Sequence, residues 1–285
     1  DDKKILFLMG FRVMSSNIKN ILFNFKSALD DISVSFSNFY LFIALAFHDI
    51  KSRYTRSRLG PWWITLNMFI SISILAFIFG NIFDTDIDQY IPHLAFGFLI
   101  WNYISNSIID GSSSLNQSSE TILQVALPLS IHIFKIQVTN IFIFLHHLIL
   151  VPILMIIFPE IFSWKLLLTL PGFIILTINL MSISIIFSIL SARFKDFAEL
   201  VKNLMQMAFY LTPVIWMPDV LVGRIGADLL NFNPFFHFIN LVREPLQGNF
   251  IHFNSWVISF FSAFLFLILA LFVFGKNKKN IPYWV

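Results

Sequence analysis

The sequence predicts an all-α integral membrane protein: six transmembrane helices, an N-terminal cytoplasmic interface helix, and two short re-entrant periplasmic helices between spans five and six. The composition is 57% hydrophobic and only 12% charged, whereas soluble domains carry about 25% charged residues. Long uncharged runs have roughly the 17–25 residues that cross a bilayer as a helix. These runs are apolar on all faces, unlike barrel strands, which alternate over about 10 residues.

The apolar runs divide the chain into parts. We expect residues 1–38 to form a cytoplasmic N-terminal segment, 39–58 an amphipathic interface helix, 61–274 the transmembrane domain and 275–285 a cytoplasmic tail. The fifth span reaches full length only if Lys202 extends its charged head to the inner surface. The six spans are expected at 61–83, 91–114, 133–158, 166–192, 198–218 and 253–274.

The basic residues set the predicted orientation. Sixteen of the 19 lysines and arginines fall on one set of alternate loops, and only Lys165, Arg224 and Arg243 fall on the other. Cytoplasmic loops carry such an excess of cations. Both termini are therefore predicted to be cytoplasmic, which agrees with an even number of spans. Most of these cations sit beside a span, so a nucleic-acid partner is not expected.

The N-terminal region changes character near residue 39. Residues 30–38 read as a loop, and 39–58 are apolar first and basic second. Such a segment is typical of a helix in the membrane interface. Gly60-Pro61 is expected to break the helix and turn the chain into the membrane. Trp62 and Trp63 then sit where an aromatic belt is expected.

The outer segment 219–252 is neither soluble in character nor long enough to span. Its apolar run is split by Pro234, and runs of about 10–14 residues are more often interfacial or re-entrant. We expect two short helices in the outer leaflet. Before them, Pro213 should kink or end the fifth span.

Several kinds of chemistry have no sequence support. The ten glycines include no pair with Walker A spacing, so the chain is not expected to be its own P-loop ATPase. There is no cysteine and no HExxH zinc motif. His146 and His147 are adjacent, and neighbouring helix positions point about 100° apart. No catalytic residue and no metal site are therefore predicted.

Polar and aromatic side chains remain inside the predicted spans. Asn102, Asn106 and Asp110 recur at every fourth position of span two. Two interpretations stay open: hydrogen bonds to a neighbouring helix, or the lining of a hydrated conduit. Aromatic rings can stack on the apolar face of a sugar. The aromatic candidates for such a conduit are Trp62, Trp63, Phe209, Tyr210 and Trp216.

Three stretches together resemble a known family. They are "DIKSRYTRSRLGPWWITLNMFISISILAFIFGNIF" (49–83), "LSARFKDFAELVKNLMQMAFYLTPVIWMP" (190–218) and "NPFFHFINLVREPLQG" (233–248). In this order they resemble the ABC-2 type permeases that export bacterial polysaccharides. The resemblance runs from about residue 39 to the C-terminus, and is strongest to O-antigen exporter permeases, with capsule and teichoic-acid exporters as near neighbours.

The resemblance implies a transport subunit rather than an enzyme. Two copies would form the pathway as a homodimer, with two separate ATP-binding-cassette subunits on the cytoplasmic side. This chain would need no cofactor, because ATP and Mg²⁺ would be bound by the partner subunits. The substrate would be a polysaccharide on undecaprenyl pyrophosphate, exported across a bacterial inner membrane. Alternatives are a capsule, teichoic-acid, lipid or drug substrate, a membrane-embedded enzyme, or a plain channel.

The resemblance also implies roles for particular residues. A coupling helix is expected within about 115–127, and residues 219–248 would form a periplasmic gate. We expect the arginines of segment 53–58 either to attract the lipid pyrophosphate or only to anchor the segment at headgroups. The expected residues are, for ATPase coupling, Arg53, Arg56, Ser119 and Glu120; for pyrophosphate, Arg53, Arg56 and Arg58; and for the gate, Pro234, Phe235, Phe236 and Arg243.

Overall fold

The computed structural model describes residues 20, 22–55, 57–82, 86–221 and 230–285, and all regular structure in these ranges is helical. The predicted all-α class is therefore confirmed. The longer helices are α3 (Trp62–Ile82), α4 (Ile87–Gln117), α6 (Leu129–His147), α8 (Thr169–Arg193), α9 (Phe197–Leu211) and α12 (Phe253–Asn277). The shorter ones are an N-terminal helix (Leu22–Ser37), α2 (Phe39–Arg53), α5 (Ser119–Gln124), α7 (Leu150–Ile157), α11 (Pro234–Leu246), α13 (Ile281–Trp284), and the 3-10 turns η1 (Pro159–Ile161), η2 (Trp164–Leu168) and η3 (Pro218–Leu221).

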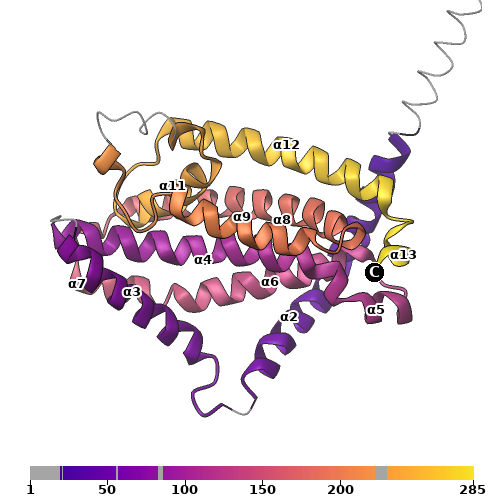
Figure 1. Ribbon diagram of the computed structural model, residues 1–285, viewed down its shortest axis with the longest axis horizontal. Helices are drawn as coiled ribbons and strands as arrows, with labels where there is room; N and C mark the ends of the chain where they lie inside the picture. Colours follow the sequence, from indigo (N-terminus) through magenta and orange to yellow (C-terminus); the bar gives the residue numbers. More distant parts are fainter. Residues whose placement is uncertain (1–19, 21, 56, 83–85, 222–229) are drawn as a thin grey trace, which may run out of the picture.

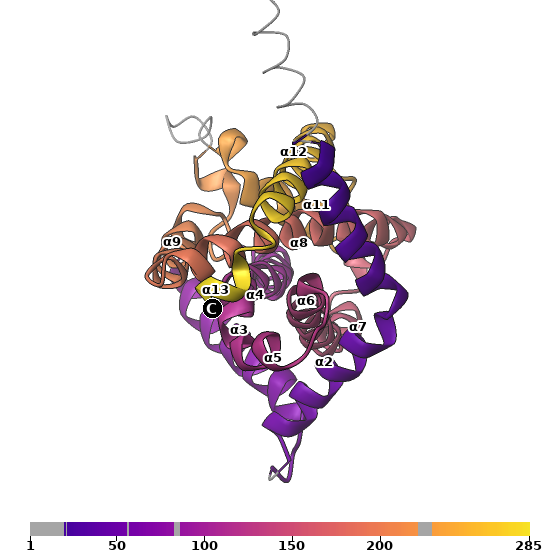
Figure 2. The ribbon, with the colours of Figure 1, turned by 90° about the vertical axis from the view of Figure 1, so that its right-hand side faces the viewer.

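Helix α4 forms the centre of the bundle. It packs most extensively against α8 and α6, while α3, α9 and α11 contact its other sides. Helix α12 lies on α8, away from α4 (Figures 1 and 2). The two ends of the bundle differ. The α5 end holds α5, α13 and the C-terminus, and the α11 end holds α7 and α11 (Figure 1).

Burial explains why α4 is central. Its apolar side chains Leu99, Ile100 and Ile104 are almost fully buried against Leu176 and Leu180 of α8. By contrast, α12 exposes a series of phenylalanines, including Phe260, Phe261 and Phe264. Large apolar side chains on the outer face of a helix are costly in water, and they are typical of helices that contact lipid.

Within the part of the chain that the structure describes, four helical segments are long and apolar enough to cross a membrane: Trp62–Gly80, Leu129–Ile157, Trp164–Arg193 and Phe253–Asn277. A fifth is possible if the N-terminal helix and α2, which are bent by 68°, count as one span. The chain is thus a multi-pass membrane protein. Polar side chains lower the hydropathy of α4, and α9 has only 15 residues, so the count of six spans stays a prediction.

Of the predictions for single segments, one is wrong and two are confirmed. The loop expected at 30–38 is wrong, because the N-terminal helix continues to Ser37 and buries Ala28, Asp31 and Ser35 on one face. The break at Gly60-Pro61 is confirmed: α2 ends at Arg53, Gly60 has φ +56°, and α3 begins at Trp62. Helix α9 ends at Leu211, as Pro213 predicts.

Candidate functional site

The central helix leaves one narrow side uncovered. Most residues of α4 are buried, but Phe98, Asn102, Asn106, Asp110 and Ser113 are all half-buried. They recur every three to four residues, so they lie on one side of the helix. We call this set the open stripe. It contains all three polar residues that the sequence singled out in span two.

A different side of α4 makes the polar contacts to neighbouring helices. The carbonyl oxygen of Ser107 accepts hydrogen bonds from Gln137 Nε2 (2.9 Å) and from Ser184 Oγ (2.9 Å). A Cβ atom at Gly111 would collide with the Ser184 side chain, so α4 and α8 are in close contact there. Asn102 instead donates to Phe98 O of its own helix (3.2 Å). Ser107 and Gly111, which join α4 to α6 and α8, are thus not members of the open stripe, whereas Asp110 of the stripe also interacts with Asn140 of α6.

Aromatic side chains of α9 border this stripe. The Phe209 ring lies 6.3 Å from Phe98 and 5.7 Å from Trp101, centroid to centroid. Tyr210 follows it at 5.5 Å and is 66% exposed. Trp216 Nε1 donates to Tyr210 O (3.4 Å). The structure therefore brings Phe209 against Phe98 of the open stripe, with Tyr210 next to Phe209 and Trp216 next to Tyr210.

The two tryptophans predicted to line the conduit, Trp62 and Trp63, lie on α3 and not on α4 or α9. Trp62 and Trp63 are the first residues of α3, and both are exposed. Helix α3 lies obliquely to α4 (Figure 1) and buries Met68 and Ile72 of its middle in the main hydrophobic cluster. Trp62 and Trp63 thus lie before the part of α3 that enters this cluster.

At the α11 end, a buried arginine holds the segment that follows α9. Arg243 of α11 is 1% exposed. Its Nη1 donates to Pro213 O (2.7 Å) and its Nη2 donates to Asn240 Oδ1 (2.7 Å). His93 Nε2 lies 3.2 Å from Arg243 Nη1 and 3.2 Å from Trp216 O. We call Arg243, Asn240, His93 and the carbonyls of 213–216 the arginine joint.

Two further contacts hold the same segment against α4. Tyr90 donates its hydroxyl to Ile215 O (2.9 Å). A Cβ at Gly97 would lie 3.2 Å from Val214 O, so glycine lets the two backbones approach. Residues after a helix lose intrahelical partners for their carbonyls. The arginine joint and Tyr90 supply these partners and fix the path of the unwound segment.

The predicted gate residues occupy α11. Pro234 is at its first turn, and Asn233 caps it by accepting from Phe235 N (3.0 Å). Asn233 Nδ2 also donates to Thr212 Oγ1 (3.0 Å), which ties α11 to the end of α9. The Phe235 ring packs 5.7 Å from Trp101, and Phe236 is half-buried. The gate role itself remains a prediction.

The residues predicted for ATPase coupling lie on two surface regions. Glu120 is exposed on α5, where no side chain is buried, and Ser119 is half-buried beside it. Arg53 is exposed at the end of α2, which packs on α6, and Arg58 is exposed in the turn before α3. Arg56 lies outside the described residues.

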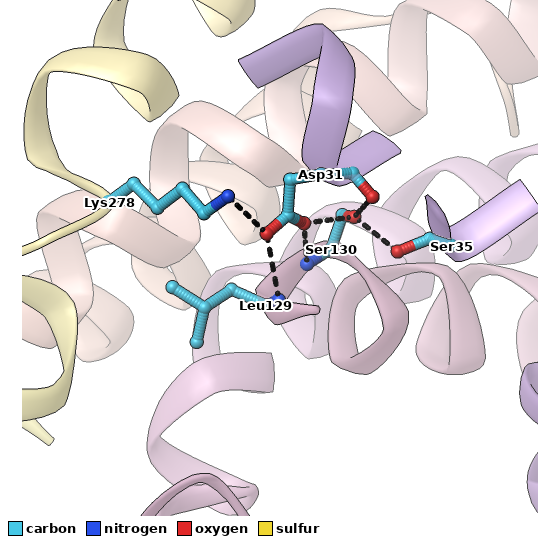
Figure 3. A network of polar contacts seen from close by, with 5 residues as sticks. All are labelled: Asp31, Ser35, Leu129, Ser130 and Lys278. Carbon is cyan, nitrogen blue, oxygen red and sulfur yellow. Dashed lines mark hydrogen bonds and ion pairs between the residues drawn. The ribbon is translucent and has the colours of Figure 1, made fainter. Parts of the chain in front are cut away.

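A second buried charge, which the sequence did not reveal, holds the α5 end. Asp31 accepts hydrogen bonds from Leu129 N (3.3 Å) and Ser130 N (3.0 Å), the first two residues of α6, and from Ser130 Oγ (2.6 Å). Lys278 Nζ lies 2.9 Å from Asp31 Oδ2, the oxygen that also accepts from Leu129 N (Figure 3). Ser35 Oγ is 2.6 Å from Ser130 Oγ. We call these residues the aspartate joint.

The aspartate joint has a clear physical basis. The first amides of a helix lack intrahelical partners, and a carboxylate there interacts favourably with the helix dipole. The joint connects the N-terminal helix, the start of α6 and the residue after α12. Sequence reasoning missed it because Asp31 was placed in a loop. The spacing of Ala28, Asp31 and Ser35 was the available signal for one buried helix face.

Sequence comparisons relate the chain to known membrane transport proteins. The sequence profile described as "ABC-2 type transporter" matches residues 40–246. Two proteins of Klebsiella pneumoniae named "O-antigen export system permease protein RfbA" are each 25% identical to this chain, covering 84% of it and 93% of their own length. A Myxococcus xanthus protein of the same name is 24% identical, over 68% of this chain and 75% of its own length.

Proposed function

Because the chain belongs to the ABC-2 type transporter membrane family, we propose that it exports an undecaprenyl-pyrophosphate-linked polysaccharide of the O-antigen class. It would act as the permease subunit in a bacterial inner membrane, driven by ATP hydrolysis in a separate subunit. The observation that carries the proposal is the open stripe of α4, which is mostly polar and half-buried, with Phe209 packed on its Phe98 and Tyr210 next to Phe209. A polysaccharide needs such a surface, with partners for its hydroxyl groups and flat rings for its apolar faces.

A single copy offers only one wall of a conduit. Polar side chains that face hydrocarbon are costly, so a membrane protein is expected to cover the open stripe. A second copy of the chain related by two-fold symmetry would place its own stripe opposite. In this homodimer, Asn102, Asn106 and Asp110 line the pathway together with Phe209, Tyr210, Trp216 and the tryptophans that begin α3.

Energy would enter at the α5 end. No side chain of α5 is buried, and only Ser118 separates α5 from the central helix α4, so a displacement of α5 would pass into α4. We assign ATPase coupling to Ser119, Glu120, Arg53 and Arg56. Charge reversal at Glu120 should uncouple ATP hydrolysis from export while the ATPase subunit still co-purifies. Unchanged coupling would remove α5 from this role.

We also propose a second role for the arginines of segment 53–58. Arg53, Arg56 and Arg58 would attract the lipid pyrophosphate through two-pronged hydrogen bonds. Lysine keeps the charge but not the planar fork of arginine. Replacement of all three by lysine should therefore preserve membrane insertion and weaken export. Normal export in this variant would favour simple headgroup anchoring.

Topology can be tested directly, because the chain has no cysteine. With six spans and both termini in the cytoplasm, a single cysteine introduced at residue 58 should resist a membrane-impermeant thiol reagent in intact cells. A cysteine at residue 252 should react. Labelling at residue 58 would overturn this orientation.

The transport function is tested by gene deletion in the host. Loss of the chain should remove O antigen from the cell surface and leave lipid-linked polysaccharide inside, and the wild-type chain should restore export. Surface O antigen that persists after deletion would refute the proposal and favour a capsule, teichoic-acid, lipid or drug substrate.

A further inference from the structure

A cavity of about 640 Å³ lies at the α11 end, next to the arginine joint. Its walls come from the start of α4, the last residue of α7 with residues 158–161, residues 217–219 after α9, and α11 with the segment that follows it. Small-molecule sites in proteins have volumes of about 300–1,000 Å³. The cavity therefore has room for a ligand of several rings. Two of its lining residues, Phe236 and Arg243, are also predicted gate residues, but no role given above assigns a ligand to the cavity.

The charge of the lining limits what can bind. Four carboxylates line the cavity: Asp88, Glu160, Asp219 and Glu244. The one lining arginine, Arg243, already donates to a backbone carbonyl and to a side-chain amide. A cleft lined mainly by one sign of charge repels ligands of the same sign. A phosphate or another anion is therefore a poor fit.

A bound metal ion does not explain the carboxylates either. Among the described residues, no group of three His, Asp or Glu side chains is placed to hold a metal ion. The four carboxylates thus surround the cavity instead of converging on one point. Such dispersed acceptors suit a ligand that presents many donors over a wide surface.

The rest of the lining has the same character. The amides of Gln247 and Asn249 can both donate and accept hydrogen bonds. Phe158 and Phe236 are half-buried and line the cavity with aromatic rings. Carboxylate acceptors, amides and flat rings together match the hydroxyl groups and apolar faces of sugar rings.

We propose that this cavity binds an uncharged, hydroxyl-rich segment of the exported oligosaccharide at the α11 end of the pathway. This inference rests on the proposed export function and adds a sugar-binding site within each copy, separate from the open stripe. The cavity shares Arg243, His93 and Asn240 with the arginine joint. A sugar bound there would contact the groups that hold the segment after α9.

The test uses the full chain in lipid nanodiscs and the host's own O polysaccharide, freed of its lipid and pyrophosphate by mild acid. Isothermal titration should give saturable binding. The double variant Glu160→Gln/Gln247→Ala removes one charged acceptor and one amide outside the core, and should weaken binding by about tenfold or more. Glu199→Gln removes an exposed carboxylate of α9 that does not line the cavity, and should bind as the wild type does.

A second cavity variant tests whether weaker binding in Glu160→Gln/Gln247→Ala comes only from the lost charge. Phe236→Leu keeps an apolar side chain but removes the ring, and should also weaken binding. Absence of saturable binding, equal affinity of wild type and both cavity variants, or binding of Ca²⁺ in place of polysaccharide would each overturn the inference. If deletion of the gene abolishes export while the cavity variants bind and export normally, only the cavity assignment fails. If deletion leaves export intact, the proposed function fails as well.

Discussion

Two buried charges hold opposite ends of the bundle, and their partners differ in kind. Asp31 meets a cation, Lys278, and the first two amide groups of α6. Arg243 meets the carbonyl of Pro213, the amide oxygen of Asn240 and the ring of His93. Within the described residues its Nε has no hydrogen-bond partner. Asp31 is compensated by a direct ion pair, whereas Arg243 is hydrogen-bonded to neutral groups and has only the nearby charge of Glu244, with which it forms no direct ion pair in the described residues, as its opposite charge.

This difference indicates different roles. Burying a charge is costly unless an opposite charge and hydrogen bonds compensate it. The aspartate joint meets both conditions, so it should act as a fixed connection between the N-terminal helix, α6 and the C-terminal region. The arginine joint meets the first condition less fully, because Glu244 is nearby but forms no direct ion pair in the described residues, and it borders a cavity. We therefore expect it to be the joint that rearranges during transport.

The largest effect on stability is expected at the aspartate joint. Asp31→Ala would leave Lys278 without its counter-charge and two amides of α6 without acceptors, at a cost of about 3–5 kcal/mol. Thermal unfolding of the purified chain in detergent should show this as a clear drop in midpoint. Asp30→Ala, at the exposed neighbouring residue, is the matched control and should change little. Equal effects of the two substitutions would refute the joint.

A smaller stability loss, with a larger loss of transport, is expected at the arginine joint. Arg243→Lys keeps the charge but cannot reach Pro213 O and Asn240 Oδ1 with the same planar fork. Its cost should be about 1–3 kcal/mol, whereas export by cells should fall strongly. A double-mutant cycle with His93→Ala should give a coupling energy of about 0.5–3 kcal/mol. Additive effects would separate His93 from the joint.

The α5 end and the α11 end can also be compared at a glycine in close contact with another backbone. A Cβ at Gly275 would meet the backbone of Asn24, and a Cβ at Gly172 would meet the backbone of Leu241. Alanine at either position should cost about 1–3 kcal/mol through overpacking, seen in the same unfolding assay. Gly80→Ala is the control, because its nearest new neighbour is a Tyr90 ring atom at 3.9 Å. A tolerated Gly172→Ala would mean that α8 and α11 can separate easily.

The smallest effect on stability is expected on the open stripe. Asn106 is half-exposed, so Asn106→Leu should leave the unfolding midpoint nearly unchanged and lower export. Gln137→Leu on α6 should instead lower the unfolding midpoint and leave export by the folded protein nearly unchanged. It removes the donor to Ser107 O and Ser184 Oγ inside the bundle. A large stability loss in Asn106→Leu would favour the interpretation of the stripe as helix-packing contacts.

The sequence predicted those features that depend on local chemistry. Apolar runs predicted the helices, Gly60 and Pro213 predicted breaks, and the spacing of Asn102, Asn106 and Asp110 predicted one helix face. The aspartate joint escaped prediction because its partners are about a hundred residues apart along the chain. Of the partners of Arg243, His93 was hidden by its distance along the chain, and the carbonyl of Pro213 because a backbone group gives no sequence signal. The polarity of α4 became understandable only once its central position was known.

The central claim is that the open stripe of α4 contacts polysaccharide during export. A photoreactive benzoylphenylalanine at residue 106 tests it in cells that make O antigen and carry the ATPase partner. A second probe at residue 265, on the exposed face of α12, serves as the comparison. The account predicts polysaccharide adducts at residue 106 that disappear when the ATPase is inactivated, and none at residue 265. Adducts of equal yield at both positions, or none at residue 106, would contradict it.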